Sequence, residues 1–315
     1  MKSFSLETIT DEQKAYDFLK RVLHPEGLQC PTCGTALPID QAPHTRGRAP
    51  LVNYRCRNCG GVFNLFTDTL FQGTHYDCQT LVLLLHDIIA GRPSSEISTE
   101  LALDYSTVLK WRHIIQEQAF CKCISAEIAD ETAEADETYV NAGQSGEEKD
   151  IDDDPPRQRG NKARGRGTLD NDRPPIVGVV GRESDRLHLK MVPDTEQETL
   201  MTYLKHITDD DITLHTDSNQ AYNPVADTGR DHHTVNHADH EYARDVDDDG
   251  EYEVHDNTIE GIWTGLKNFL RPFRGLHKKF LPQYIAMFEW LYNLEELTSD
   301  FLRMLLVPNF TYSPT

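Results

Sequence analysis

The sequence predicts a multidomain chain of 315 residues, in which a small cysteine-rich domain and an all-α domain precede a mixed α/β domain. Three observations lead to this prediction: two early Cys-x-x-Cys pairs, a strongly helical pattern over residues 76–120, and an alternation of strand-like and helix-like segments that begins near Ala133. The expected parts are an N-terminal helix in residues 1–24, the cysteine-rich domain in 25–75, the all-α domain in 76–125 and the α/β domain in 126–305.

The four paired cysteines predict a structural zinc site. Cys30 and Cys33 form one pair, Cys56 and Cys59 form the other, and 22 residues separate the pairs. A two-residue gap lets both thiolates of a pair reach one ion, and four cysteines fill the zinc tetrahedron without leaving an open position for chemistry. We therefore expect a zinc ribbon with structural Zn²⁺. Structural cysteines without metal are the alternative, and a redox enzyme is disfavoured because both pairs occur together in ribbon spacing.

The helical segment that follows has the pattern of a helix-turn-helix. Ser94–Ala102 is the expected first helix, Leu103–Tyr105 the turn and Ser106–Gln116 the recognition helix. The slightly negative charge of the segment fits a plain helical hairpin without a DNA role equally well. The side chains expected to face the major groove are those of Ser106, Thr107, Lys110 and Arg112.

The α/β domain begins with a strand at Ala133–Val140 and is interrupted by a polar segment at 143–175, which is too polar to bury a core. The order of the elements implies a mixed sheet on which helices pack. The later strands are expected at 176–181, 186–192, 211–215 and 233–237, and the helices at 195–206, from about 257, and at 282–305.

Three acidic residues indicate phosphoryl-transfer chemistry. Asp136 falls on the first strand, Asp217 at the end of a later strand, and Glu260 on a helix. Two metal ions that clamp the attacking and leaving oxygens need such hard oxygen ligands, which suit Mg²⁺ or Mn²⁺. Lys267 lies two helical turns past Glu260 on the same face. Near neighbours leave the assignment open. Glu134 and Glu137 flank Asp136, although Glu137 is expected on the opposite face of the strand, and Asp256 is a rival to Glu260.

The charge distribution permits DNA binding despite a formal net charge of −21. Such an acidic balance alone argues against nucleic acid, but residues 41–67 contain four Arg and no acid, and residues 261–288 are also basic without acid. Basic islands in an acidic chain suit a DNA-binding protein from a salt-adapted prokaryote, with ordinary solvated faces as the alternative. The basic residues expected to contact DNA are Arg55, Arg57, Lys267, Arg271 and Arg274.

Together these motifs resemble the zinc-ribbon group of insertion-sequence transposases of bacteria and archaea. The resemblance covers residues 26–295 and rests on the cysteine pairs and on the motifs at 66–71, 135–140, 177–180, 216–217 and 257–267. That family is similar in fold to ribonuclease H and retroviral integrase, and it uses a DDE triad with Mg²⁺ or Mn²⁺. By motif match, Asp136, Asp217 and Glu260 are the expected triad, with Lys267 as the accompanying base.

The resemblance implies a transposase that binds the terminal inverted repeats of its element, cuts the DNA and joins the 3′-hydroxyl ends to target DNA. Its partner would be double-stranded DNA, bound by at least a homodimer. We expect a cytoplasmic protein at the nucleoid, without membrane contact. Met1–Thr10 is polar, and the apolar stretch Leu81–Ala90 is too short to span a bilayer. The alternatives are a DNA-binding regulator with an inactive C-terminal domain, and a ribonuclease-H-like hydrolase without strand transfer.

Overall fold

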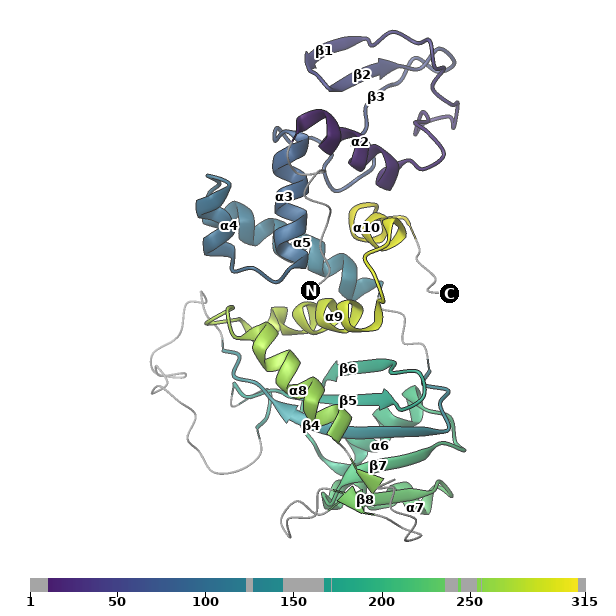
Figure 1. The fold of residues 1–315 in the computed structure, drawn as a ribbon, viewed down its shortest axis with the longest axis vertical. Coiled ribbons are helices and arrows are strands. Elements are labelled where there is room, and N and C mark those ends of the chain that lie inside the picture. The colour runs from purple at the N-terminus through teal and green to yellow at the C-terminus, as the bar shows by residue number, and fades with distance from the viewer. Residues whose placement is uncertain are drawn as a thin grey trace. The chain divides into compact units, whose positions relative to one another are not determined.

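The structure is a computed structural model, and it describes residues 11–122, 127–143, 167–170, 172–235, 243–244, 254–255 and 257–310. The chain divides into two compact units. The first comprises the residues up to Lys122 together with those from Leu294 onwards, and the second comprises Cys123–Asn293 (Figure 1). Residues 294–305, which the sequence analysis placed in the α/β domain, therefore belong to the first unit. Most of the polar segment at 143–175, and Asp256, lie outside the described residues.

The first unit begins with the predicted N-terminal helix. The carboxylate of Asp11 accepts a hydrogen bond from the Lys14 backbone N–H at 3.0 Å and so caps α2. Glu12 then ties α2 to α3 by accepting the backbone N–H groups of Cys78 and Gln79 at 2.9 and 2.8 Å. The helices of this unit are α2 (Glu12–Leu23), α3 (Cys78–Ile89), α4 (Ser94–Glu100), α5 (Tyr105–Cys121) and α10 (Ser299–Leu306).

A small antiparallel sheet lies between α2 and α3 in the sequence. Its strands are β1 (Thr45–Arg48), β2 (Leu51–Arg55) and β3 (Val62–Phe63), in the order β1-β2-β3. Ring contact between Tyr54 and Phe63, with centroids 6.3 Å apart, joins β2 to β3.

The last helix predicted from the sequence is two helices in the structure. The first, α9 (Leu281–Asn293), ends where the Asn293 amide bonds the backbone N–H and C=O of Leu187 at 2.8 and 2.7 Å. Thr298 then caps the start of α10 by accepting the Phe301 N–H at 3.1 Å. The sequence has one apolar periodicity through this region, but α9 has a fixed end and α10 has its own N-cap. The region therefore forms two helices, which belong to different units.

The second unit is built on the predicted mixed sheet. Its strand order is β6-β5-β4-β7-β8; β4 pairs antiparallel with β5, which pairs antiparallel with β6, while β4, β7 and β8 run parallel. This confirms the mixed α/β sheet expected from the sequence. The strands are β4 (Thr132–Tyr139), β5 (Pro175–Gly181), β6 (Leu187–Met191), β7 (Thr213–Asp217) and β8 (His232–Val235), with a short separate pair, β9 (Ala243–Arg244) and β10 (Val254–His255).

Helices cover both faces of this sheet. Val177 and Val179 of β5 belong to the core cluster that contains α6 (Gln197–Ile207), and Ile176 and Val180 belong to the cluster that contains α8 (Asn257–Leu270) and α9. Alternate side chains of β5 therefore pack into two different cores, which is why every residue of this strand is buried. Short helical turns, η1 (Gln220–Tyr222) and α7 (Pro224–Asp227), follow β7, and η3 (Lys278–Phe280) precedes α9.

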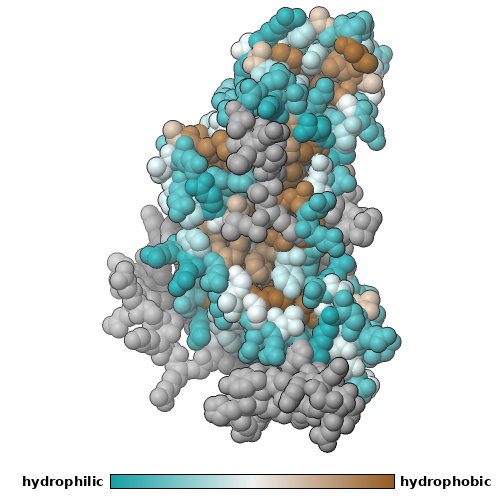
Figure 2. All heavy atoms as spheres, viewed as in Figure 1, coloured by the Kyte–Doolittle hydropathy of each residue, from teal (hydrophilic) through white to brown (hydrophobic). Residues whose placement is uncertain are grey.

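Hydrophilic residues are spread over the face seen in Figure 2, which agrees with a chain in which 26% of residues are charged. Among the helices described, none combines the length and the apolar character needed to cross a membrane.

Candidate active site and metal sites

The four predicted cysteines converge in the first unit. The Sγ atoms of Cys30 and Cys59 are 3.5 Å apart, and those of Cys33 and Cys56 are 3.6 Å apart. All four lie within 4.8 Å of one another. Zinc–sulfur bonds of about 2.3 Å in a tetrahedron place sulfurs about 3.8 Å apart, so the cluster has the size that one zinc ion requires.

Both cysteine pairs are held in the same kind of turn. The backbone N–H of Gly34 bonds the carbonyl of Cys30 at 2.8 Å, and that of Gly60 bonds the carbonyl of Cys56 at 3.0 Å. The two glycines have φ values of 70° and 76°, which favour residues without a Cβ. Hydrogen bonding with Thr35 also lowers the pKa of Cys33 to about 6, and the thiolate is the form that binds metal.

A second group of ligands forms where β4 and β7 lie side by side in the second unit. Carboxylate oxygens of Asp136, Glu137 and Asp217 lie within 4.8 Å of one another. Burial raises the pKa of Asp136 to about 7, and the charges of Glu137 and Asp217 add to this effect. Oxygen ligands crowded in this way suit a hard divalent cation, whose charge would relieve their repulsion.

Glu137 joins the acidic group, although the sequence analysis did not include it in the site. Its carboxylate bonds the hydroxyl of Tyr222 at 2.9 Å, and Tyr222 belongs to the core on the α6 side, as strand alternation predicts. One of its oxygens nevertheless reaches the group formed by Asp136 and Asp217. The registered pairing of β4 with β7 ends at Ala135 and Thr216, and Asp136 and Asp217 are the residues that follow this last pair.

Asn219 joins two of these acids, and the sequence analysis also missed it. Its backbone N–H donates to Asp217 at 2.9 Å and its side-chain amide donates to Glu137 at 2.9 Å. The only sequence signal was its position two residues after Asp217, which is typical of a turn that follows a strand. Asn219 and Tyr222 therefore fix the orientation of the acidic group from the side of β7.

Helix α8 is fastened to β4 at two points. At its start, the fully buried Glu134 accepts the Ile259 backbone N–H at 3.0 Å and the Thr258 hydroxyl at 3.1 Å, and it pairs with Arg182 at 3.0 Å. One turn later, the indole N–H of Trp263 donates to Asp136 at 2.7 Å. A carboxylate at a helix N-terminus is favourable, so Glu134 acts as a buried anchor for α8.

Gly178 makes the contact between Trp263 and Asp136 possible. It lies opposite Asp136 in the β4–β5 pairing. A Cβ at this position would lie 2.6 Å from the ring of Trp263 and 2.8 Å from Leu189. The absence of a side chain therefore lets the indole lie against β5 and reach the carboxylate.

The third predicted acid, Glu260, is not among the three converging carboxylates of the described residues. It is exposed on α8, three residues before Trp263. Residues three apart on a helix are neighbours, so Glu260 and Trp263, the partner of Asp136, are neighbours on α8. Lys267 follows on the exposed surface of the same helix.

One residue predicted to contact DNA is buried. Arg112 of α5 has no exposed surface; its guanidinium donates to the Ser94 hydroxyl at 2.9 Å and to the Arg92 carbonyl. The prediction that it faces a DNA groove is wrong, because Arg112 shares the buried face of α5 with Val108 and Ile115. Of the other predicted DNA contacts, Thr107 is half-buried and the rest are exposed: Arg55, Arg57, Ser106, Lys110, Lys267, Arg271 and Arg274.

Known proteins agree with the resemblance inferred from the motifs. Residues 128–293, more than half of the chain, match the family of the ISXO2-like transposase domain. The chain belongs to this transposase family, which is part of the DDE superfamily. A relative described as an uncharacterized protein in transposable element ISH50 of Halobacterium salinarum is 26% identical over 292 residues, which are 90% of this chain and 92% of the relative.

Solved structures with some similarity include two viral or transposon assemblies. One is the simian T-cell lymphotropic virus intasome in complex with PP2A regulatory subunit B56 gamma, with 9% identity, a TM-score of 0.31 and coverage of 74% of this chain and 77% of the other. Another is a pre-cleavage Mos1 transpososome, with 11% identity, a TM-score of 0.20 and coverage of 69% and 79%. Scores this low do not establish a shared fold.

Proposed function

We propose that this insertion-sequence transposase binds the terminal inverted repeats of its own element, cuts the phosphodiester at each end and joins the freed 3′-hydroxyl to target DNA. The observation that carries the proposal is the convergence of Asp136, Glu137 and Asp217 beside helix α8. The relative from transposable element ISH50 supports the choice of DNA as the substrate.

The acidic group fits Mg²⁺ or Mn²⁺. Asp136 and Asp217 would hold the ions, with Glu137 or Glu260 as a further ligand, and all of these offer the oxygen atoms that such cations prefer. When bound, two ions would polarise the scissile phosphate and activate the attacking water or 3′-hydroxyl. The ammonium group of Lys267 would lie against the phosphate charge on the open side of α8.

The first unit would supply DNA recognition. The four-cysteine cluster would hold Zn²⁺ and present Arg55 and Arg57, while α4 and α5 would act as a helix-turn-helix with Ser106 and Lys110 directed at the DNA. Because two element ends must be held together for joining, we expect at least a homodimer on DNA.

The test is a cleavage assay on a labelled duplex that carries the element end, at high salt and with added Mg²⁺ or Mn²⁺. We expect nicking at the end by the unaltered protein, and strand-transfer products when target DNA is added. Asp217→Asn should abolish both, whereas Asp209→Asn, an exposed acid outside the site, should have no effect. Tight and specific binding without cleavage under any of these metals would instead establish a DNA-binding regulator with an inactive second unit.

A further inference from the structure

We propose that a pocket at the C-terminal end of α8 binds one unpaired nucleotide of the DNA strand, close to the bond that is cut. This inference rests on the proposed function, because it assigns part of the DNA end to a place beside the acidic group. The pocket lies entirely within the second unit.

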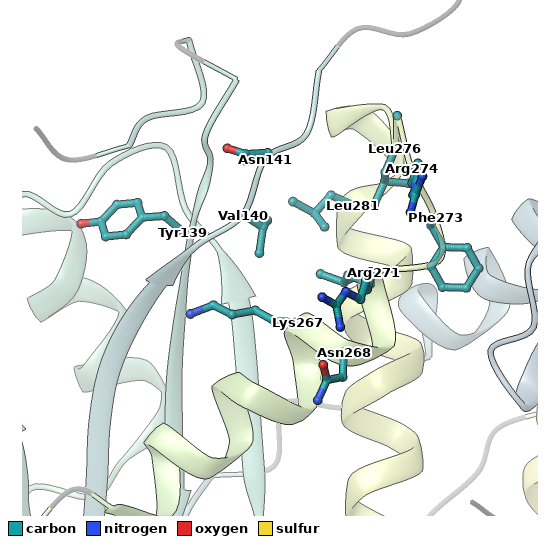
Figure 3. A pocket seen from close by; sticks show the side chains of 12 residues that line it. Tyr139, Val140, Asn141, Lys267, Asn268, Arg271, Phe273, Arg274, Leu276 and Leu281 are labelled. Carbon is teal, nitrogen blue, oxygen red and sulfur yellow. The ribbon is translucent and has the colours of Figure 1, made fainter. Parts of the chain in front are cut away.

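The pocket is a cavity of about 680 Å³ between the end of β4 and the C-terminal part of α8 with the loop that follows it (Figure 3). This volume is in the range of sites that enclose a small organic molecule. Apolar side chains from both walls line it, and two amide side chains add polar groups that could bond a base edge. These residues are Val140, Leu270, Leu276, Leu281, Asn141 and Asn268.

Three cations stand at the same pocket. Lys267, Arg271 and Arg274 are exposed and line the cavity, and in Figure 3 the Lys267 side chain extends from α8 towards β4. Within the described part of the chain, none of the three side chains forms an ion pair. Unpaired cations around an apolar cavity are complementary to a nucleotide, because phosphates need charge while the base face needs an apolar surface.

Backbone bonds join the two walls of the pocket. The backbone N–H of Gly143, which follows β4, donates to the Leu276 carbonyl at 3.1 Å, and the Lys278 N–H donates back to the Gly143 carbonyl at 2.8 Å. The Lys278 side chain also pairs with Asp172 at 3.3 Å. The cavity is therefore already formed, and binding would require little rearrangement of the protein.

Both walls lead directly from the acidic group. Asp136 and Tyr139 are three residues apart on β4, which is about 10 Å along a strand. Lys267 lies four residues after Trp263, the partner of Asp136, which is about 6 Å along α8. DNA rises about 3.4 Å per nucleotide along its axis, so a nucleotide in the pocket would lie within about three positions of the cut bond.

An unpaired nucleotide suits the pocket better than a base pair. The cavity has room for one base against its apolar lining, and a base can enter only after it leaves the duplex stack. The cations at the opening would then hold the phosphates on either side of it.

The test places 2-aminopurine, whose fluorescence rises when it is unstacked, at each of the first five positions from the cut on either strand. With the unaltered protein, we expect a several-fold rise at one position and little change at the others. Asn268→Trp, which fills the pocket from an exposed position on α8, should remove this rise, whereas Asn268→Gln should keep it.

A base-deleted substrate separates pocket filling from misfolding. Asn268→Trp should bind the DNA end within about threefold of the unaltered protein but cut it at least tenfold more slowly, and removing the base at the responding position should restore cutting. Cleavage by the unaltered protein with no fluorescence rise at any position would overturn the pocket assignment and leave the transposase function standing. Absence of both binding and cleavage would overturn both.

Discussion

The cysteine cluster and the acidic cluster are both groups of metal-type ligands, but they are assembled differently. The four cysteines lie within 30 residues, and each pair is set by a local turn with its own glycine. The carboxylates come from two strands about 80 residues apart, and their orientation depends on Asn219, Tyr222 and Trp263. Loss of one ligand should therefore disrupt the cysteine cluster, whereas the acidic cluster should also be disrupted by changes at residues that bind no metal.

The largest effect is expected from breaking the local cluster. Cys56→Ser should lower the zinc content from about one ion per chain to near zero, because three thiolates no longer close the tetrahedron. Folding of such a small domain depends on its metal, so binding of the element end should fall by about a hundredfold or more. Elemental analysis and a DNA-binding titration measure the two effects.

The matched control for this variant is Cys121→Ser, an exposed cysteine of α5 outside the cluster. It should keep the zinc and the affinity. Full zinc content in the Cys56 variant would show that the four sulfurs do not share one ion.

The acidic cluster should be sensitive to a residue that holds no metal. Gly178→Ala would place a methyl group 2.6 Å from the ring of Trp263 and push the indole away from Asp136. A displacement of about 1 Å at a catalytic group can cost about a hundredfold in rate, so we expect cleavage to slow by about ten- to a hundredfold while zinc content stays unchanged.

Gly261→Ala is the control for Gly178→Ala. Gly261 is on α8 next to Glu260, and a Cβ there meets nothing within 4 Å. Alanine in place of a helical glycine should stabilise the protein by up to about 1 kcal/mol and leave the cleavage rate close to its original value. Equal rates for both variants would mean that Trp263 does not position the site.

The difference between a cluster formed by local turns and one formed by distant strands also explains which features the sequence predicts. Local spacing predicted the cysteine cluster with its four members, and the alternation of residues 133–140 and 176–181 predicted the central strands. The sequence also predicted Asp136 and Asp217 as site residues, because each lies on a recognisable strand, and the structure brings their carboxylates together. Glu137 was left out because alternation places it on the opposite face from Asp136, and alternation does not reveal that its carboxylate still reaches the other two acids.

Arg112 was misplaced for a related reason. A cation in a candidate recognition helix is expected to face solvent, but here Ser94 and the Arg92 carbonyl accept its hydrogen bonds inside the unit. Those partners lie about 20 residues away in another segment, so only the packing of α4 against α5 brings them to the guanidinium.

Acidity should affect stability through Asp136. Its pKa of about 7 exceeds the ordinary value near 4, so in Mg²⁺-free buffer the folded state keeps a proton that the unfolded state loses between about pH 4 and 7. The free energy of unfolding should therefore fall as pH rises through this window, by up to about 1.4 kcal/mol per pH unit from this group.

Urea titrations of the unaltered protein and of Asp136→Asn measure this effect, since the amide cannot titrate. The variant should show a flatter dependence on pH between 5 and 7. Added Mg²⁺ at pH 7.5 should stabilise the unaltered protein more than the variant. Identical pH profiles would contradict the raised pKa.

The smallest effect should come from Lys110, and Arg112 provides the comparison on the same helix. Lys110→Ala removes an exposed cation and should change the free energy of unfolding by no more than about 0.5 kcal/mol. If Lys110 contacts a phosphate, the variant should also reduce the salt dependence of DNA binding by about one charge.

Arg112→Ala should instead destabilise the first unit by about 2–3 kcal/mol, because it leaves buried acceptors unsatisfied. Thermal unfolding together with binding at several salt concentrations separates the two roles, and an unchanged salt slope for Lys110→Ala would show that α5 does not meet the DNA backbone at this position.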